Sequence, residues 1–256
     1  MSGWLVRWAV VALQLTLLWS FHGTALAATP AVVGGVEHTV ALRSDGTLWA
    51  WGNDSYGQLG QGRLTQSATA IATQGLPAVN SIVCGARHNL VLGRDGTVWS
   101  WGANALGQLG DGGTTDRNVP VQVPGLSGVG ALAAGFAHSM ALGSDGTVWA
   151  WGSNSSGQLG DGSTTDRKAP VRVAGLSGVV EIAAGMGYSL ARKSDGTVWA
   201  WGSNNSGQLG DGSTNSRSTA AQVLWLSGVV GLAAGGTPVN FRADGSGGYG
   251  GGRSSY

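Results

Sequence analysis

The sequence predicts an all-β protein of the β-propeller class, and two observations lead to this prediction. A stretch of the form DGTVWAWG occurs four times, with the first tryptophan of each copy 50 residues after that of the copy before. Each copy is followed by a Gly-rich loop that contains GQLG. A fixed period of this size with short apolar runs is typical of propellers and other repeat arrays. The repeated tryptophans are Trp49, Trp51, Trp99, Trp101, Trp149, Trp151, Trp199 and Trp201.

The third repeat shows which elements one period should contain. Val129 to Gly135 is a small apolar run that predicts a buried strand, and His138 to Leu142 predicts a second. Asp145-Gly146 indicates a two-residue hairpin of type I′. Thr147 to Gly152 is β-branched and aromatic and predicts a third strand, and Pro170 to Val173 opens a fourth. Four short antiparallel strands are the content of one propeller blade.

The third strand of the repeat is apolar on both faces. Trp149 and Trp151 should point to one face, and Val148 and Ala150 to the other. A sheet with two apolar faces is expected to lie between two other sheets, as a blade does. Each buried indole N–H then needs an acceptor, and we expect a backbone carbonyl in an adjacent loop.

Three histidines recur in register: His38, His88 and His138, with Tyr188 in the fourth place. Three histidines can bind zinc when they converge on one ion. These lie one per blade, so we expect no metal site and instead a structural hydrogen bond within or between blades.

The motifs GxxHxxAL, DGTVWAWG and NxxGQLGDG resemble the regulator-of-chromosome-condensation repeat over about Val32 to Gly235. The resemblance implies a propeller that is normally seven-bladed and closed by strands from both chain ends in one blade. Its members include guanine-nucleotide exchange factors, a plant ultraviolet photoreceptor, a secreted bacterial inhibitor of β-lactamases and many secreted bacterial proteins. The regular repeats and the N-terminal segment are most similar to the last, bacterial group.

The number of repeats is smaller than the family norm. We expect four blades at about 31–80, 81–130, 131–180 and 181–230, and a partial fifth at 231–244 within a repeat region of 28–244. Gly231 to Gly235 begins the fifth unit, and then the pattern stops in mid-repeat. We therefore expect an open or truncated ring from a truncated or frame-shifted gene; the alternative is a short protein that closes by oligomerisation. Residues 245–256 form a Gly-rich tail that should be disordered.

Residues 1–27 have the features of a secretory signal. Arg7 precedes an apolar run, and small residues end the segment at Ala27. The run is too short to span a bilayer comfortably. We expect cleavage near Ala27 and a secreted or periplasmic chain without stable membrane insertion; an uncleaved anchor is the alternative.

Composition argues against several functions. The chain has 14 basic and 13 acidic residues, whereas nucleic-acid recognition depends on a basic footprint, so no nucleic-acid partner is expected.

Cys84 replaces an alanine of other repeats and should fill a small buried site. The Gly-rich loops contain Asp111, Asp116, Asp161 and Asp166, whose spacing does not match an EF-hand; we expect the adjacent Asp-Arg pairs to form a solvated edge. We expect no catalytic residues, cofactor or metal.

Positions that differ between repeats are the candidates for binding. The most variable turns precede the histidine position and offer Glu37, Arg87, Phe136 and Met186, a mixture typical of a protein-contact surface. A second candidate is the set of loop segments 63–69, 117–119, 167–169 and 217–219. The alternative is that both are unconstrained turns.

The leading functional hypothesis is a non-catalytic, secreted or periplasmic scaffold that binds an as yet unidentified protein. The first alternative, by analogy with the family alone, is an exchange factor for a small GTPase. The second is a secreted inhibitor of a β-lactamase or cell-wall enzyme.

Overall fold

The computed structural model describes residues 28–235 and 240–242. The predicted signal segment 1–27, Asp244 and the predicted tail 245–256 lie outside the described residues. All regular structure in the described part is β-strand. Accordingly, that part includes no helix with the length and apolarity needed to cross a membrane.

The strands form four sheets, one per sequence repeat, which we call blades 1 to 4. Blade 1 holds β1 (Ala31–Gly34), β2 (His38–Leu42), β3 (Leu48–Gly52) and β4 (Ser67–Ala72). Blade 2 holds β5 (Val79–Cys84), β6 (His88–Gly93), β7 (Val98–Gly102) and β8 (Arg117–Gln122). Blade 3 holds β9 (Val129–Ala134), β10 (His138–Gly143), β11 (Val148–Gly152) and β12 (Arg167–Arg172). Blade 4 holds β13 (Val179–Ala184), β14 (Tyr188–Lys193), β15 (Val198–Gly202) and β16 (Arg217–Gln222).

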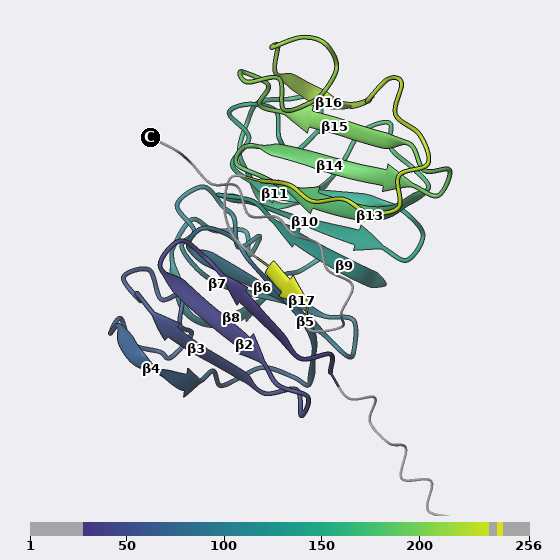
Figure 1. Ribbon diagram of the computed structural model, residues 1–256. Helices are drawn as coiled ribbons and strands as arrows, with labels where there is room; N and C mark the ends of the chain where they lie inside the picture. Colours follow the sequence, from purple (N-terminus) through teal and green to yellow (C-terminus); the bar gives the residue numbers. More distant parts are fainter. Residues whose placement is uncertain (1–27, 236–239, 243–256) are drawn as a thin grey trace, which may run out of the picture.

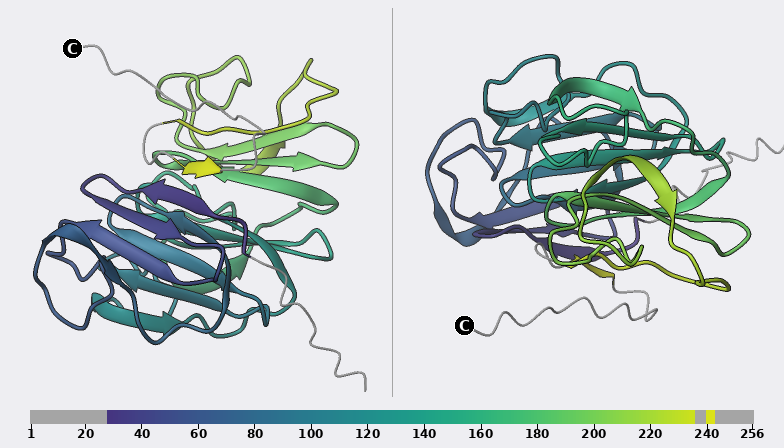
Figure 2. Two further views of the ribbon diagram at one scale, coloured as in Figure 1. Left: turned by 60° about the horizontal axis from the view of Figure 1, so that its bottom comes forward. Right: turned by 90° about the horizontal axis from the view of Figure 1, so that it is seen from above.

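The blades follow one another in sequence order and form an open arc (Figures 1 and 2). Within each blade, neighbouring strands pair antiparallel in an up-and-down order. Successive blades pack through their first and second strands, whereas blade 4 makes no comparable contact with blade 1 among the described residues. The predicted propeller class is therefore confirmed, with a ring that is not closed.

Each pair of successive blades buries one apolar cluster, because the middle strands of each blade carry mainly apolar side chains on both faces. We call the face toward the next blade the outgoing face and the other the incoming face. At the third junction, Met140 and Ala150 on the outgoing face of blade 3 pack with Ala191 and Trp201 on the incoming face of blade 4. The side chains of all four are fully buried or nearly so, which confirms the expected alternation of the WAWG strand.

The hairpin between the second and third strands differs from the prediction. Gly146 has a φ of 78°, but Asp145 is not among the residues with positive φ, whereas a type I′ turn needs positive φ at both central residues. The Gly143 amide donates to the Thr147 carbonyl and the Gly146 amide to the Gly143 carbonyl, so the loop has three residues. Asp145 instead accepts hydrogen bonds from the amide and hydroxyl of Thr147, which favours this longer turn.

The fourth strand also begins earlier than predicted. In blade 3 it starts at Arg167 rather than at Pro170, and Arg167 pairs with Gly152 across a register shift. The polar composition of the strand start concealed it, since β12 is the outermost strand and its residues are exposed or half-buried.

The fifth unit is represented by two short segments. Residues 231–235 do not form a strand, but Leu232 donates its amide to the Glu181 carboxylate of blade 4 at 3.1 Å. The strand β17 (Asn240–Arg242) pairs antiparallel with β1, so that blade 1 has five strands. Val32 of β1 pairs with Phe241 on one side and with Ala41 on the other. Phe241 lies 200 residues, or four repeats, after Ala41, so β17 and β2 pair with β1 through equivalent positions of their repeats.

Candidate protein-contact surface

The four variable turns lie between the first and second strands of their blades, and backbone hydrogen bonds join them into one band. The Val36 amide donates to the Ala86 carbonyl at 2.9 Å, the Ala86 amide to the Phe136 carbonyl at 3.2 Å, and the Phe136 amide to the Gly185 carbonyl at 3.3 Å. Each turn is therefore held by the turn of the following blade. The sequence-predicted residues Glu37, Arg87, Phe136 and Met186 belong to this band, which we call the turn surface.

Most of the side chains on the turn surface are exposed. Val36, Phe136 and Met186 have 46%, 40% and 57% of their surface accessible, and Glu37 and Arg87 are also exposed. Three apolar side chains and two opposite charges thus face solvent within one connected band. This mixture is typical of protein-contact surfaces.

Sequence analysis missed one member of the turn surface. Tyr56, from the GQLG loop of blade 1, accepts a hydrogen bond from the Arg87 guanidinium at 3.2 Å, and Arg87 lies over its ring at 4.9 Å from the centroid. This contact fixes the Arg87 side chain beside the turns. The corresponding residues of the other repeats are Leu106, Ser156 and Ser206, so variation between repeats was the signal that could have identified Tyr56.

The second candidate surface, at the outer loops, is stabilised by an ion pair within each of blades 2, 3 and 4. Arg117 pairs with Asp111 at 2.7 Å, and Arg167 pairs with Asp161 in the same way. Asp116 and Asp166 are exposed and the arginines next to them are partly exposed, so the predicted solvated edge is present. Each arginine pairs with the aspartate six residues before it and not with its neighbour. Asp116 instead accepts a hydrogen bond from the Asn104 amide at 2.7 Å, because the loop folds back on itself.

The recurring histidines are buried and take part in the blade junctions. His88 of blade 2 contacts Ser139 of blade 3, with 3.0 Å between Nε2 and Oγ. Ser139 in turn donates its hydroxyl proton to the Gln108 carbonyl of blade 2 at 2.7 Å, so the histidine Nε2 must be the donor. The same arrangement joins His138 to Ser189 and His38 to Asn89. The predicted structural hydrogen bond is confirmed, and it crosses between blades.

The three histidine rings are buried, and burial lowers the pKa of each. Burial lowers the pKa of His88 to about 3, helped by the neighbouring His138 and His38, and burial lowers the pKa of His138 to about 4. The pKa of His38 is lowered by burial as well. Each ring packs on the α-carbon of the glycine three residues before it, where a β-carbon would collide with the imidazole. Among residues 28–235 and 240–242, no cluster of three or more metal-ligating side chains occurs.

The second tryptophan of each WAWG stretch bonds to the preceding blade. Trp151 of blade 3 donates its indole N–H to the Gln108 carbonyl at 3.0 Å, the same carbonyl that Ser139 reaches. Trp101 and Trp201 do the same with the carbonyls of Gln58 and Gln158. The sequence predicted a loop carbonyl as the acceptor. It did not reveal that one carbonyl serves two side chains of the next blade.

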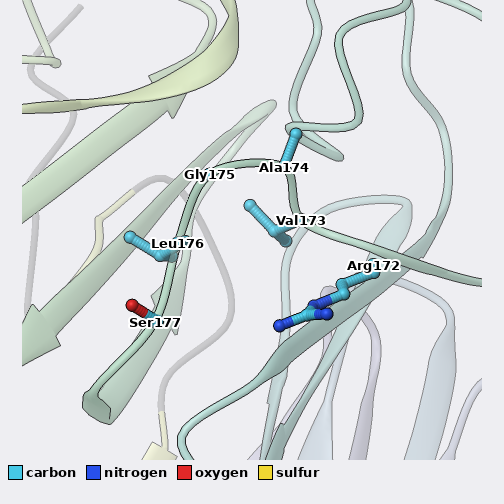
Figure 3. Close-up of a pocket in the computed structure, with 6 residues that line it drawn as sticks. All are labelled: Arg172, Val173, Ala174, Gly175, Leu176 and Ser177. Carbon is cyan, nitrogen blue, oxygen red and sulfur yellow. The ribbon is translucent and has the colours of Figure 1, made fainter.

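The two remaining candidate sites are the buried residue Cys84 and a shallow hollow. Cys84 is fully buried, as predicted, and burial raises the pKa of its thiol well above the usual range. Figure 3 shows a hollow lined by the segment Arg172 to Ser177, which connects blades 3 and 4. Its lining is backbone and small side chains apart from Arg172 and Leu176, and no group of titratable side chains converges there.

The architecture defines the class of protein as a repeat-built β-propeller, and comparisons with known proteins identify the family. The RCC1-like domain family matches residues 19–240. The chain therefore belongs to the RCC1-like domain family. A comparison with curated proteins gave no match.

Several solved structures are similar to the chain. Yeast RCC1 (Prp20) bound to Kap60 is 24% identical with a TM-score of 0.66, over 75% of this chain and 48% of the other. Human WBSCR16 is 25% identical with a TM-score of 0.65, over 73% of this chain and 50% of the other. A structure of Prp20p from Saccharomyces cerevisiae, described with its binding to Gsp1p and histones, is 24% identical with a TM-score of 0.65, over 75% and 49%. The chain spans about half the length of these proteins.

Proposed function

We propose that the chain is a non-catalytic, secreted or periplasmic scaffold that binds another protein through the turn surface. The observation that carries this proposal is the band of backbone hydrogen bonds, which sets the variable, exposed residues of four blades side by side on a rigid support. A binding site on rigid elements loses little conformational entropy when a partner docks.

The chemistry of the turn surface indicates the kind of partner. Val36, Phe136 and Met186 offer apolar contact, while Glu37 and Arg87 lie among them with opposite charge. Aromatic residues, Met and Arg are enriched at the centres of protein interfaces. A folded protein with an apolar patch and charges of both signs fits this surface better than a highly charged polymer.

The family relationship supports a protein partner in general terms. Solved structures describe yeast Prp20 bound to Kap60 and its binding to Gsp1p and histones. At 24% identity this likeness concerns the fold, so an exchange-factor role for this chain is the alternative proposal. The secreted location rests on the signal-like segment 1–27 and the small residues that precede Ala28.

A site-specific photo-crosslinker tests the binding proposal. Replacing Phe136 by a photoreactive phenylalanine analogue should give a discrete adduct with a second protein in expressing cells, identified by mass spectrometry. The matched control carries the analogue at Val180, which is 48% exposed but lies at the start of β13, away from the turns. Absence of an adduct at Phe136, or the same adduct at Val180, would contradict the proposal.

Two further measurements test the location and the alternative. A secreted chain should be recovered from the periplasm or medium with Ala28 as its first residue, whereas a chain retained in the cytoplasm with residues 1–27 attached would reject secretion. An exchange factor should instead accelerate nucleotide release from a small GTPase, and Arg87→Glu should change that rate.

A further inference from the structure

The three junctions within the chain share one set of contacts, and each contact has a fixed direction. The outgoing blade offers the carbonyl of the GQLG glutamine, and the incoming blade offers a tryptophan N–H and a hydroxyl or amide side chain. A loop glycine of the outgoing blade also donates its amide to the outermost strand of the incoming blade. These pairs are Gly62 with Asn118, Gly112 with Lys168, and Gly162 with Ser218, at 2.7 to 2.9 Å.

The incoming face of blade 1 carries the same groups without a blade against it. Val32 is 45% exposed, whereas its equivalents Ile82, Leu132 and Ile182 are 4%, 9% and 9% exposed. Trp51 is only partly buried, whereas Trp101, Trp151 and Trp201 are completely buried. The Trp51 indole N–H has no acceptor among the described residues, and Thr39 occupies the position of Ser139 and Ser189.

The outgoing face of blade 4 carries the complementary groups. A β-carbon added at Gly57, Gly107 or Gly157 would meet the outermost strand of the next blade within 3 Å, whereas Gly207 meets nothing within 4 Å. Gly210 is exposed, although Gly60, Gly110 and Gly160 are buried against the next tryptophan. The Gln208 carbonyl and the Gly212 amide have no partner among residues 28–235 and 240–242.

We propose that blade 4 of one chain docks head to tail on blade 1 of a second copy of the same chain. The Gln208 carbonyl then accepts the indole N–H of Trp51 and the hydroxyl of Thr39 from the second copy. The Gly212 amide donates to the Ala68 carbonyl of the second copy, which stands in the position of Asn118, Lys168 and Ser218. This fourth junction repeats the three that already exist within the chain.

A second copy fits these faces better than an unrelated apolar partner. The faces need donors and acceptors at fixed positions, and the chain supplies both halves of that pattern at its two ends. Such an interface is heterologous, and it closes into a ring when two copies meet at both ends. Two copies would form eight blades, which lies within the range of about 4–8 blades known for propellers.

One segment of the chain must move for the docking to complete. Residues 231–235 lie where the first strand of a following blade belongs, held by the Leu232 amide on Glu181 and by Gly235 on the Tyr188 hydroxyl. We expect β1 of the second copy to replace this segment along the inner half of blade 4. The outer half, with Gly207 and Gly210, has no such contact with residues 231–235.

Light scattering on the purified full chain over a concentration series tests the proposal with two matched glycine variants. Gly207 and Gly212 have φ values of 75° and 78°, and neither has a neighbour within 4 Å, so alanine strains the single chain similarly at both. Their equivalents differ, because a β-carbon at Gly57, Gly107 or Gly157 would collide with the next blade. At Gly62 it would make only an ordinary contact of 3.5 Å with a Val119 methyl group, and at Gly112 and Gly162 it would meet nothing within 4 Å. Gly207→Ala should weaken association by about ten-fold or more, and Gly212→Ala should leave it nearly unchanged.

A mixing experiment tests the direction of the interface. Val32→Lys damages only the incoming face at an exposed position, and Gly207→Ala damages only the outgoing face. Each variant alone should associate more weakly than the wild type. At a concentration at which each variant alone is monomeric, an equal mixture should form a particle of two chains through the one intact junction. The wild-type particle should have twice the mass of one chain.

Three results would overturn the proposal. They are a wild-type chain that stays monomeric at all concentrations, an equal effect of Gly207→Ala and Gly212→Ala, and a mixture of the two face variants that does not associate. Trp51→Ala provides a second incoming-face variant, and circular dichroism on every variant confirms that the blades have formed.

Discussion

The hydrogen-bond relay at the junctions shows how single residues hold the blades together. Ser139 lies between two groups of the preceding blade: it accepts from His88 and donates to the Gln108 carbonyl. Loss of the Ser139 hydroxyl would leave the buried His88 Nε2 without an acceptor, which typically costs about 1–3 kcal/mol, whereas the Gln108 carbonyl would keep the Trp151 indole N–H. The Asn89 side chain performs both tasks at the first junction with its oxygen and its nitrogen.

The buried histidines predict a loss of stability in acid. Burial holds the pKa of His138 at about 4, below the 6.5 of the unfolded chain. The folded protein therefore binds fewer protons than the unfolded chain in this window. The buried neutral ring of His138 therefore has no effect on the free energy of unfolding above pH 6.5, and the free energy of unfolding decreases as the pH falls from 6.5 toward 4. His138→Gln can still donate to Ser189 and should reduce the loss between pH 7 and 4 by about 3 kcal/mol.

Chemical denaturation at a series of pH values measures this effect. Glu181, which is partly exposed, gives a control substitution (Glu181→Gln) that should leave the histidine contribution in place. Equal acid destabilisation of the wild type and His138→Gln would show that the ring is not held neutral by the junction.

Trp225 is the one described residue other than glycine with positive φ, and this predicts a stabilising substitution. Its φ is 64°, and glycine occupies the same position at Gly75, Gly125 and Gly175. The side chain is fully exposed, so no contact offsets the backbone strain. Trp225→Gly should raise the free energy of unfolding by about 1 kcal/mol.

Leu224→Gly provides the comparison for Trp225. Leu224 is also exposed but lacks positive φ, so glycine there should lower stability by adding entropy to the unfolded chain. A gain of similar size in both variants would indicate that removal of an exposed apolar side chain, rather than relief of strain, is the cause.

At the scale of elements, the GQLG loop is the part of each blade that binds the second WAWG tryptophan of the next blade. The second glycine of the motif approaches the following tryptophan so closely that a β-carbon at Gly110 would lie 2.7 Å from the Trp151 Nε1. The loop itself is shaped by buried asparagines, such as Asn154, whose Oδ1 accepts the Leu159 amide and whose Nδ2 donates to Asp161. The loop therefore presents the Gln carbonyl at a fixed position.

A pair of glycine substitutions tests the contact between the GQLG loop and the tryptophan of the next blade. Gly110→Ala and Gly112→Ala both place alanine at positive φ, but only Gly110 has a close neighbour. Gly110→Ala should lower the free energy of unfolding by about 1–3 kcal/mol more than Gly112→Ala, because Trp151 must shift. Urea denaturation of the two variants gives this difference, and equal losses would mean that the loop yields without disturbing the junction.

The repeated elements could be predicted well from the sequence, because the WAWG and GxxHxxAL motifs indicate where the strands lie and which of their residues share a face. The hairpin was missed since Asp-Gly also suits a three-residue loop, in which Asp145 bonds to Thr147 and only the glycine needs positive φ. The outer strand start at Arg167 was missed because exposed strand residues lack an apolar pattern. The role of Tyr56 depends on a contact with the next blade, which no local pattern contains.

At the scale of the whole molecule, the repeated residues and the variable residues have separate places. The repeated tryptophans, histidines and glycines lie in the junctions between blades. The variable residues Glu37, Arg87, Phe136 and Met186 form the turn surface, which the band of backbone bonds keeps continuous. The faces at the two ends of the arc are the exception, because there repeated residues remain exposed.

The most direct test of this division compares Trp151→Phe with Trp51→Phe by the free energy of unfolding of the single chain. Trp151 is completely buried and bonds to the Gln108 carbonyl, whereas Trp51 is partly buried with no indole acceptor among the described residues. We predict that Trp151→Phe costs about 2–3 kcal/mol and Trp51→Phe less than about 1 kcal/mol. Equal losses in the two variants would contradict the claim that the repeated tryptophans stabilise the protein through the junctions between blades.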